Sequence, residues 1–379
     1  MLKIGITGQT GFVGTHLYNT LGLLPDKFLR IPFEDAFFQE VGLLESFVSQ
    51  CDVIVHLAAM NRHNDPEVIY NTNIRLVKQL IAACESTRTT PHILFSSSTQ
   101  EERDNLYGKS KKEGRELLEQ WADRNNAHFT GLIIPNVYGP FGNPFYNSVV
   151  ATFCHQLTQN EQPRIDVDGE MKLVYVDELV KNILNIVEKS QEEQGKGVKV
   201  QQIKIEHTSE VKVSQLLQIL EKFKANYFEK GEVPDLANPF YRNLFNTFVC
   251  YIDHSTFFPF KLIKNTDNRG SFVEIIKLNS GGQVSFSTTV PGITRGNHYH
   301  TRKAERFAVI KGKARIDLRR IGTSKVLSFE MDGNQPSFVD MPVWYTHNIT
   351  NTGEEDLYTI FWISEKFDAN DTDTYFENV

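Results

Sequence analysis

A glycine-rich turn stands near the start of the chain, directly after a short apolar run. Residues 2–7 favour a strand, and the segment Thr7-Gly8-Gln9-Thr10-Gly11-Phe12-Val13-Gly14 leads from them into a helical pattern. Glycines at this spacing let the backbone approach a pyrophosphate closely, so that the phosphate meets free N–H groups and the positive end of the helix dipole. A glycine turn between the first strand and the first helix is typical of dinucleotide binding. We therefore predict a dinucleotide site here rather than a purely structural turn, formed by Gly8, Thr10, Gly11, Phe12, Val13 and Gly14.

Short apolar runs alternate with helical patterns through the first half of the chain. The strand-like runs are rich in β-branched residues, as buried parallel strands usually are, and lie at residues 3–7, 53–57, 93–97 and 130–134. The helical patterns lie at residues 73–86, 110–125 and 177–189. Strand and helix in alternation predict βαβ units and an α/β fold with a Rossmann-type, doubly wound parallel sheet.

The pattern changes near residue 250. From about residue 257, strand-like runs separated by glycine, proline and asparagine lie at residues 271–278, 284–288, 304–310, 314–318 and 359–363. Such spacing predicts an all-β barrel or sandwich. A chain of 379 residues also suits two or three domains of ~150 residues each. We place the first domain at residues 1–250, with a small mixed subdomain at 203–248, and the second at 256–379.

Composition limits the partners. The chain carries 40 Lys and Arg against 47 Asp and Glu, a net charge of −7, which argues against a nucleic-acid partner and against a polybasic membrane anchor. No apolar run approaches the ~20 residues that span a bilayer, so we expect no membrane insertion. The four cysteines form no close pair and fit a reducing compartment: Cys51, Cys84, Cys154 and Cys250. We therefore expect a cytoplasmic protein.

The end of the second predicted strand, roughly residues 27–31, bears on the choice of coenzyme. An NAD site usually places an acid there to hold the ribose hydroxyls. Here the sequence reads Phe28-Leu29-Arg30, and a guanidinium suits a 2′-phosphate. We therefore expect NADPH with Arg30 as a contact. The alternative is that Arg30 is a solvated surface residue.

A tyrosine and a lysine four residues apart carry the predicted redox chemistry. Tyr107 and Lys111 share one face of a helix, and a nearby ammonium lowers the pKa of a phenol, so that it can exchange a proton near neutral pH. Upstream, the strand at 93–97 ends in hydroxyl groups that can hydrogen-bond a reacting oxygen. Alone, the pair would be an ordinary surface pair. Together with the glycine loop and the serine-tipped strand, we interpret it as catalytic.

Residues 1–248 resemble the extended short-chain dehydrogenase/reductase family, and within it the branch that acts on nucleotide sugars. Further matches are Asp52–Ala59, Asn73, Pro135–Pro140 and Tyr175–Glu178. The resemblance implies that Ser98 is the catalytic hydroxyl, Tyr107 the acid/base and Lys111 the ribose-binding lysine. It also implies contacts to the coenzyme from Leu57, Ala58, Ala59 and Asn73, and to the substrate from Asn136.

Two departures from this family narrow the reaction. Tyr107 lies only nine positions after Ser98, a shorter gap than in the 4-epimerases and 4,6-dehydratases. Thr99-Gln100 stand where the dehydratases carry a glutamate beside the catalytic hydroxyl. Both features weigh against dehydration and leave simple carbonyl reduction.

A cluster of potential metal ligands lies in the second half. His298 and His300 alternate along a predicted strand and so point to one face, Glu305 can return from the neighbouring strand, and His347 supplies a fourth group. Three imidazoles and a carboxylate suit a divalent metal. The alternative is a set of satisfied or surface histidines. We predict zinc rather than iron or manganese.

This half resembles two kinds of protein at once. It is similar to a cupin, which implies an all-β jelly-roll barrel, with His298, His300, Glu305 and His347 in the ligand positions, although Trp344 replaces the usual glycine of the second motif. It is also similar to the dTDP-4-keto-6-deoxysugar 3,5-epimerases, which implies that Arg269 and Arg295 hold the diphosphate and that His298 is a base. We favour the ligand role for His298, because all four ligands are present, and this leaves the base unidentified.

The whole chain resembles the bifunctional capsular-polysaccharide proteins with a reductase–cupin architecture, up to the final run Asp371–Phe376. That resemblance implies C3 epimerisation of a UDP-4-keto-6-deoxy-HexNAc by the cupin, then reduction at C4 with NADPH to UDP-2-acetamido-2,6-dideoxy-L-talose. Three alternatives stay open: a reductase whose cupin is only structural or dimerising, a 4-epimerase with tightly bound NAD, and a sugar-responsive regulator. We expect a homodimer, since cupin barrels often pair.

Overall fold

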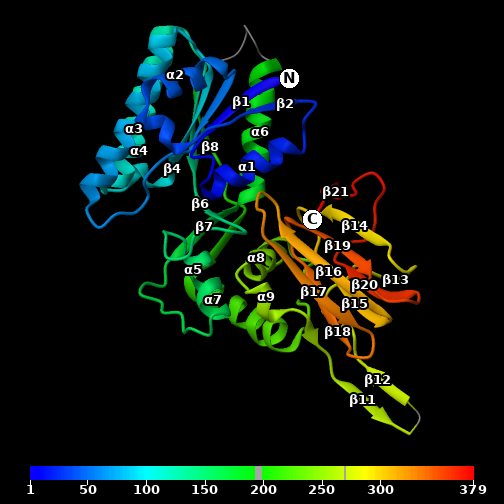
Figure 1. Ribbon diagram of the computed structural model, residues 1–379. Coiled ribbons are helices and arrows are strands. Elements are labelled where there is room, and N and C mark those ends of the chain that lie inside the picture. Colours follow the sequence, from blue (N-terminus) through cyan, green and yellow to red (C-terminus); the bar gives the residue numbers. More distant parts are fainter. Residues whose placement is uncertain (193–198, 269) are drawn as a thin grey trace. The chain divides into compact units, whose positions relative to one another are not determined.

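The computed structural model describes residues 1–192, 199–268 and 270–379, and these form two compact units (Figure 1). The first unit comprises residues 1–152 and 169–212, and the second comprises residues 153–168 and 213–379. Residues 213–249, which the sequence assigns to the reductase half, thus belong by their contacts to the same unit as the barrel. The sequence pattern changes at residues 250–256, whereas the contacts divide the chain elsewhere, so the two criteria give different domain boundaries.

A six-stranded parallel sheet forms the centre of the first unit, in the order β2-β1-β3-β4-β5-β8. Its strands are β1 (Leu2–Thr7), β2 (Phe28–Ile31), β3 (Val53–His56), β4 (His92–Ser98), β5 (Phe129–Ile134) and β8 (Val200–Lys204). The chain runs outward from β1 in one direction to β2 and in the other to β3, β4 and β5. This order puts the carboxyl ends of β1 and β3 side by side, where parallel sheets place their ligand sites.

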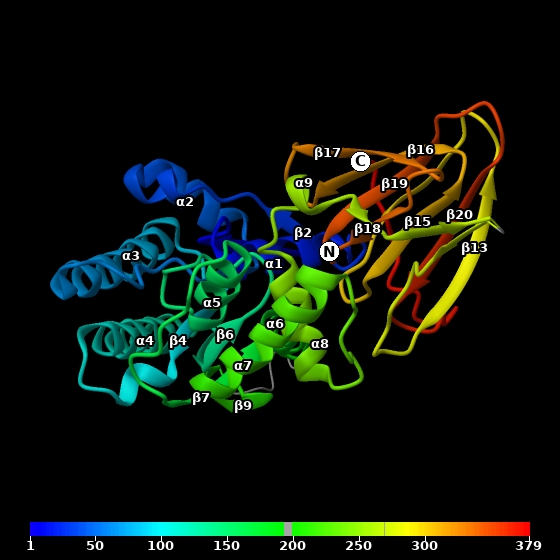
Figure 2. The same ribbon diagram turned by 90° about the horizontal axis from the view of Figure 1, so that it is seen from below.

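Helices cover both faces of this sheet. One apolar core contains residues of α2 (Val41–Gln50), α3 (Pro66–Thr87) and α4 (Leu106–Asn125), and the other contains residues of α1 (Phe12–Gly22) and α6 (Val176–Glu192). Alternate strand residues feed the two cores: Ile54 lies in the first, Val53 and Val55 in the second. Figures 1 and 2 show α2, α3 and α4 together on one side of the sheet. The doubly wound fold predicted from the alternation is therefore confirmed.

Polar caps explain where two of these helices begin. Asp65 accepts a hydrogen bond from the Glu67 N–H and Pro66 occupies the first turn, so α3 starts seven residues before the predicted pattern. Asn105 accepts a 2.7 Å hydrogen bond from the Gly108 N–H, and this cap sets the start of α4 just before Tyr107.

Shorter elements complete the first unit. A small sheet has the order β6-β7-β9, with β6 at Asn136–Tyr138, β7 at Glu170–Tyr175 and β9 at Ser209–Lys212. Two 3₁₀ turns, η1 (Asp35–Gln39) and η2 (Thr99–Glu102), lie between larger elements. Helix α5 (Val149–Thr158) carries the chain from the residues of the first unit into those of the second.

Two five-stranded antiparallel sheets dominate the second unit (Figure 2). One has the order β10-β18-β15-β20-β13 and the other β17-β16-β19-β14-β21. Their bounds are β10 (Phe260–Lys261), β13 (Gln283–Thr289), β14 (Thr294–Tyr299), β15 (Glu305–Lys311), β16 (Lys313–Arg320), β17 (Val326–Asp332), β18 (Ser337–Met341), β19 (Tyr345–Asn351), β20 (Leu357–Ile363) and β21 (Tyr375–Phe376). Residues from both sheets share one core, among them Ile316, Phe338 and Ile349. This arrangement agrees with the predicted jelly-roll barrel.

Helical segments and one hairpin accompany the barrel. The helices are α7 (Val213–Phe223), a π-helical turn η3 (Lys224–Phe228), α8 (Pro239–Val249) and α9 (His254–Phe257), and the hairpin pairs β11 (Lys264–Asp267) with β12 (Gly270–Val273). The strand predicted at 271–278 thus ends at Val273. Within the residues that the structure describes, no helix is both long and apolar enough to cross a membrane.

Candidate active site and metal centre

The glycine loop lies at the N-terminus of α1, as predicted. Gly8 has φ +72°, and a Cβ there would come within 2.9 Å of the Ala58 nitrogen. A Cβ on Gly14 would lie 2.2 Å from the Gly8 carbonyl oxygen. Gly11 caps the helix without a side chain of its own. The loop is therefore a tight cradle of bare backbone at the positive end of a helix, which fits the pyrophosphate of a dinucleotide. Thr10 is exposed, and Phe12 and Val13 are half-buried beside it.

A buried histidine ties the carboxyl ends of β1 and β3 together. His56 Nδ1 lies 2.7 Å from Thr7 Oγ1, and the same hydroxyl accepts from the Ala58 N–H at 3.4 Å. Burial, followed by the charge of Lys111, lowers the pKa of His56 to about 3, so its ring is neutral. Leu57, Ala58 and Ala59 follow directly and are half-buried beside the glycine loop.

Arg30 lies within β2 and folds back on α1. Its guanidinium carbon is 4.4 Å from the centroid of the Tyr18 ring, and its Nη1 donates to the Tyr18 carbonyl at 3.3 Å. The residue is exposed. Arg30 pairs in register with Ile4, three residues before the end of β1. A 2′-phosphate contact would therefore require the side chain to leave Tyr18.

Asn73 is buried, and its amide is engaged by the protein. The side-chain oxygen accepts from the Met60 N–H at 2.7 Å, and the amide nitrogen donates to the Met60 carbonyl and to Ser110 Oγ. Ser110 in turn donates to the Tyr107 carbonyl at 2.7 Å. In this structure Asn73 therefore fixes the chain after β3 against the first turn of α4.

Ser98, Tyr107 and Lys111 come together at the carboxyl end of β4. Ser98 is the last residue of that strand, and its hydroxyl lies near enough to the Tyr107 phenol to act on the pKa of that phenol. Lys111 is buried, its Nζ donates to the Ser96 carbonyl at 2.9 Å, and it lies 5.8 Å from the Tyr107 ring centroid. The structure thus brings the three predicted side chains to one place.

The charges at this site differ from the simple expectation. Burial raises the pKa of Tyr107 to about 12, and the hydrogen bond from Ser98 acts in the opposite direction. Burial also lowers the pKa of Lys111 to about 8. The predicted lowering of the phenol pKa by Lys111 is therefore wrong for this arrangement, because burial of the phenol outweighs the influence of an ammonium that faces the Ser96 carbonyl.

An ion pair holds the short connection between Ser98 and Tyr107. Glu101, in η2, accepts three hydrogen bonds from Arg115 on α4, and the Ser97 hydroxyl also donates to it. A Cβ on Gly108 would meet the Gln100 carbonyl oxygen at 2.0 Å, so η2 packs directly on the start of α4. The short connection between Ser98 and Tyr107 is therefore held in place by the Glu101–Arg115 ion pair and by the packing of η2 on α4.

The three predicted substrate contacts have different outcomes. Asn136 is exposed and begins β6, pairing in register with Leu173. Arg295 is exposed on β14 and donates to Thr289 Oγ1 and to the Thr288 carbonyl. Arg269 lies outside the described residues.

Four predicted ligands converge inside the barrel. The ligand atoms of His298, His300, Glu305 and His347 all lie within 4.8 Å of one another. Glu305 Oε2 lies 3.1 Å from His347 Nε2, 3.3 Å from His300 Nε2 and 3.9 Å from His298 Nε2. The His300, Glu305 and His347 atoms are buried and make no well-formed hydrogen bond within the described residues. Unpartnered buried donor atoms of N and O type, aimed at one point, fit a divalent metal.

The environment of the cluster supports this fit. Burial acts to raise the pKa of Glu305, but the three facing imidazoles outweigh burial and hold that pKa well below its usual range. The second ring nitrogens of His300 and His347 face the carbonyls of Asp373 and Tyr345. His298 is the most accessible of the four, with its side chain 25% exposed against 8% or less for the others. A metal held here would therefore be open on the His298 side.

Trp344 makes the turn that a glycine usually makes in the second cupin motif. Its backbone has φ +63°, in the left-handed region that favours glycine. Its N–H donates to the His300 carbonyl at 2.7 Å, and its buried ring packs near Tyr299. The local turn is therefore preserved despite the substitution, and it links the His347 segment to His300.

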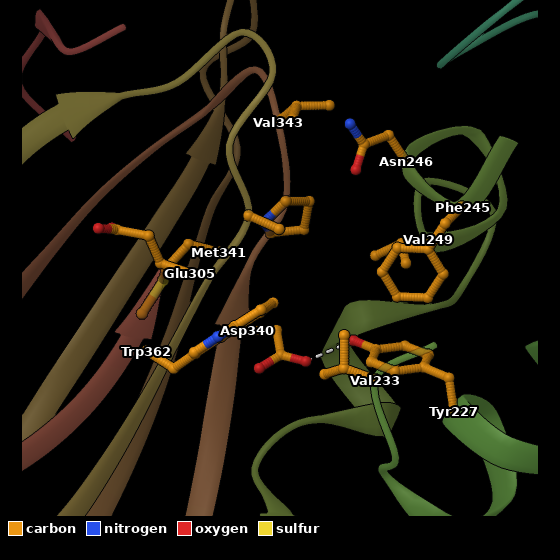
Figure 3. A pocket seen from close by; sticks show the side chains of 12 residues that line it. Tyr227, Val233, Phe245, Asn246, Val249, Glu305, Asp340, Met341, Val343 and Trp362 are labelled. Carbon is orange, nitrogen blue, oxygen red and sulfur yellow. Dashed lines mark hydrogen bonds between the residues drawn. The ribbon is translucent and has the colours of Figure 1, made fainter. Parts of the chain in front are cut away.

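A largely apolar pocket adjoins Glu305 within the second unit. Figure 3 shows Phe245, Asn246 and Val249 of α8 facing Asp340 and Met341 of the barrel. The cavity between these side chains is small, at about 20 Å³. The Tyr227 hydroxyl donates to Asp340 at 2.6 Å, as drawn, and Asp340 also pairs with buried Arg306. Because Arg306 follows Glu305 on β15, this network fixes the strand that carries one of the predicted metal ligands.

Comparison with known protein families decides the assignment of the first half. Residues 4–200 match the model described as the NAD dependent epimerase/dehydratase family, which covers more than half of the chain. The chain belongs to the NAD dependent epimerase/dehydratase family. Membership implies a nicotinamide dinucleotide at the glycine loop. Residues 265–375 match a second model, the polysaccharide biosynthesis C-terminal domain.

Full-length relatives combine the same two parts. The chain is 32% identical over 379 residues to UDP-2-acetamido-2,6-beta-L-arabino-hexul-4-ose reductase of Pseudomonas aeruginosa, covering 99% of this chain and 98% of the relative. It is similar to the crystal structure of the capsular polysaccharide assembling protein CapF from Staphylococcus aureus, with 34% identity, TM-score 0.61 and coverage of 99% and 100%. A structure of CapF with the inhibitor 3-isopropenyl-tropolone matches with 32% identity, TM-score 0.56 and full coverage of both chains. This family member therefore shares its two-part organisation with CapF along its whole length.

Several residues at these sites were not singled out by the sequence. His56 lies inside a run that matches the reductase family, so its position carried a signal, although its bond to Thr7 did not. Glu101 and Arg115 are fourteen positions apart and have no motif between them. Asp373 lies in the matching C-terminal run, and the structure brings it to His300.

Proposed function

We propose that this protein reduces a UDP-linked 4-keto-6-deoxy-N-acetylhexosamine at C4 with NADPH, after its barrel has epimerised the same sugar at C3. The product would be UDP-2-acetamido-2,6-dideoxy-L-talose, a precursor of UDP-N-acetyl-L-fucosamine for capsular or O-antigen polysaccharide. The observation that carries the proposal is the gathering of Ser98, Tyr107 and Lys111 at the end of β4, where Lys111 Nζ lies 5.8 Å from the Tyr107 ring centroid. The full-length relative named as a hexul-4-ose reductase supports it.

The reduction needs one hydride at C4 and one proton on the C4 oxygen. The dinucleotide, when bound at Gly8–Gly14, supplies the hydride. Tyr107 donates its phenolic proton to the carbonyl oxygen as the C=O double bond becomes a C–OH single bond. Ser98 donates a hydrogen bond to the same oxygen and holds the ketone against Tyr107. Lys111 binds the ribose hydroxyls of the dinucleotide through its ammonium group.

The barrel is the proposed epimerase. His298, His300, Glu305 and His347 would hold a divalent metal, which we take to be zinc, and when bound it polarises a ketone oxygen and acidifies the neighbouring C–H. The accessible His298 side suits the approach of a large nucleotide sugar, with Arg295 at hand for the diphosphate. The tropolone inhibitor of CapF is consistent with this, because tropolones chelate metals through two adjacent oxygens.

The two reactions fit one order. Inversion at C3 requires the C4 ketone, since only the ketone makes the C3 proton acidic. Reduction removes that ketone and fixes the configuration, so epimerisation precedes reduction. We further propose a cytoplasmic homodimer. The three cysteines that the structure buries, Cys51, Cys84 and Cys154, are free, which is consistent with a reducing compartment.

Net coenzyme turnover tests the reductase proposal. The purified protein, given a UDP-4-keto-6-deoxy-HexNAc, should oxidise one NADPH for each sugar consumed. A 4-epimerase would recycle its coenzyme and show no net oxidation. Protein that converts the sugar without consuming NADPH would therefore contradict the proposal. Metal-free protein that still exchanges the C3 proton would contradict the metal-assisted epimerase mechanism and leave the metal a structural part.

A further inference from the structure

We propose that the C-terminal segment, residues 371–377, is a positioning element of the metal centre and that Asp373 is its principal residue. The inference rests on the proposed metal site. The segment follows β20, returns to the barrel and ends beside the strand that carries His298. Three of the four ligands have a neighbour in it, and each contact can be followed from the ligand outward.

The first contact orients His300. The Nδ1 atom of this buried ring faces the backbone carbonyl of Asp373. A carbonyl can only accept, so the ring proton must sit on Nδ1. The Nε2 lone pair then faces Glu305, 3.3 Å from its Oε2. Asp373 therefore selects the tautomer that can bind a metal and sets the direction in which it points.

The second contact uses the carboxylate of the same residue. Asp373 is 4% exposed, and its two oxygens accept four hydrogen bonds: from the Thr301 N–H at 3.1 Å, Thr301 Oγ1 at 2.6 Å, the Arg302 N–H at 3.0 Å and the Lys303 N–H at 3.2 Å. Residues 301–303 form most of the connection between His300 and Glu305. One carboxylate thus fixes the spacing between His300, which directly follows β14, and Glu305, which begins β15.

A buried lysine also ties the connection between His300 and Glu305 to the C-terminal segment. Lys303 is 1% exposed, and its Nζ donates to the Thr372 carbonyl at 2.8 Å. Asp373 itself has φ +41°, an unfavourable value for a residue other than glycine. Burying the Lys303 ammonium and holding Asp373 at a positive φ both cost free energy of folding. Both features occur here close to His300.

The end of the segment reaches the remaining histidines. β21 pairs with β14, with Phe376 opposite His298 and Tyr375 opposite Tyr299. The Glu377 N–H donates to the Asn297 carbonyl at 3.0 Å, and the Glu377 carbonyl accepts from the hydroxyl of Thr346, the neighbour of His347. The segment therefore touches residues adjacent to His298 and His347 as well as His300 itself.

Metal affinity provides the first test. Full-length protein is freed of metal, and zinc binding is measured by competition with a chromophoric chelator. Because outer contacts to ligands typically contribute 10–100-fold, Asp373→Ala should weaken zinc binding by about that factor. The matched control is Asp368→Asn, whose exposed carboxylate precedes the segment and accepts a hydrogen bond from the Asn370 N–H. The control should bind zinc like the wild type.

Histidine tautomers provide the second test, and it requires no metal. With ¹⁵N-labelled histidine, metal-free wild-type protein should show His300 protonated at Nδ1, and Asp373→Ala should show a mixture of tautomers. Thr301→Val removes one of the four hydrogen bonds with little change of shape and should lie between the two. This milder variant keeps the test decisive if Asp373→Ala does not fold.

The outcomes separate this inference from the metal proposal. Wild-type protein that takes up no zinc contradicts the metal site, and the tautomer of His300 then judges the positioning role by itself. Zinc affinity and His300 tautomer unchanged in both Asp373→Ala and Thr301→Val would overturn the role of the C-terminal segment, even if the wild type binds zinc tightly.

Discussion

Arg115 and Glu101 form a bidentate ion pair that joins the helix carrying Tyr107 to the turn that follows Ser98. The Arg115 Nε and Nη2 atoms lie 3.0 Å and 2.9 Å from the two oxygens of Glu101. Both side chains are nearly buried, at 10% and 9% exposed. Ser98 directly precedes the turn that carries Glu101, and Tyr107 lies on the helix that carries Arg115, so we expect the ion pair to help set the separation of Ser98 and Tyr107.

Removing Arg115 should destabilise the reductase half. Arg115→Ala would leave the Glu101 carboxylate buried without its partner, which typically costs ~3–5 kcal/mol of unfolding free energy. Arg124→Ala is the control on the same helix, because Arg124 is 65% exposed and pairs loosely with Glu85, and such a surface pair contributes at most ~1 kcal/mol. Urea unfolding measures both. Equal losses in the two variants would mean that the ion pair does not support the site.

Tyr107→Phe should abolish reduction and leave C3 proton exchange intact. Loss of a general acid lowers kcat by roughly 10²–10⁴-fold, while the exchange depends on the barrel. Tyr70→Phe is the control, because the Tyr70 hydroxyl donates its hydrogen bond to Glu113 and so links helix α3 to helix α4. NADPH oxidation and solvent deuterium uptake are followed in parallel. Loss of both activities in Tyr107→Phe would contradict two separate sites.

Arg30→Ala tests the choice of coenzyme. If Arg30 leaves Tyr18 to hold a 2′-phosphate, the variant should raise the KM for NADPH by about tenfold or more and leave the KM for NADH nearly unchanged. Steady-state kinetics with both coenzymes decide this. Equal effects on the KM values for NADPH and NADH would mean that Arg30 is a surface residue that packs on the Tyr18 ring and does not bind the coenzyme.

NADPH binding should weaken as pH rises through about 8, where burial has brought the pKa of Lys111. If only the charged form holds the ribose, the Kd should rise about tenfold from about pH 7 to about pH 9. Stability changes in the opposite sense: the folded pKa is below the ordinary value of 10.5, so the unfolded state binds more protons between these values and folding gains as pH rises through them. Tyr107→Phe should keep the same pH dependence of binding, because the phenol titrates far above this range. A Kd that is flat over this interval would contradict the role of Lys111.

His347→Ala should remove metal and C3 exchange together. Its Nε2 lies closest to Glu305 among the three rings, so its loss opens one side of the cluster. Metal content per chain and deuterium uptake measure the effect, with His207→Ala of the first unit as a control. Metal content that stays the same in His347→Ala would mean that the four residues are not the ligand set.

Periodicity and motif spacing predict the fold class and the meeting of the site residues. β1 leads into Gly8 and β4 ends at Ser98, and both strands are short apolar runs bounded by distinctive residues. The parallel order of a doubly wound sheet then places the carboxyl ends of both strands at one edge. The four predicted metal ligands follow from one face of a strand and its neighbours. These features depend on local pattern, which a sequence carries directly.

Other features depend on contacts that no local pattern records. Asp373 lies 73 positions from His300, and Arg115 lies fourteen from Glu101, so only the folded chain brings these pairs together. The sequence predicts the wrong direction for the Tyr107 pKa for a related reason. The four-residue spacing indicates that Lys111 is near the phenol, but it does not indicate that the phenol is buried. The start of α3 was missed because the hydrophobic pattern begins later than the cap at Asp65.

Heavy water offers the most direct test of two reactions on one sugar. A UDP-4-keto-6-deoxy-HexNAc is incubated with NADPH and zinc-loaded protein in D₂O, and the product is examined by NMR. We predict a C4 alcohol with inverted C3 configuration, one deuterium at C3, none at C4, and one NADPH oxidised per product. A product with its original C3 configuration and no deuterium there would contradict the account.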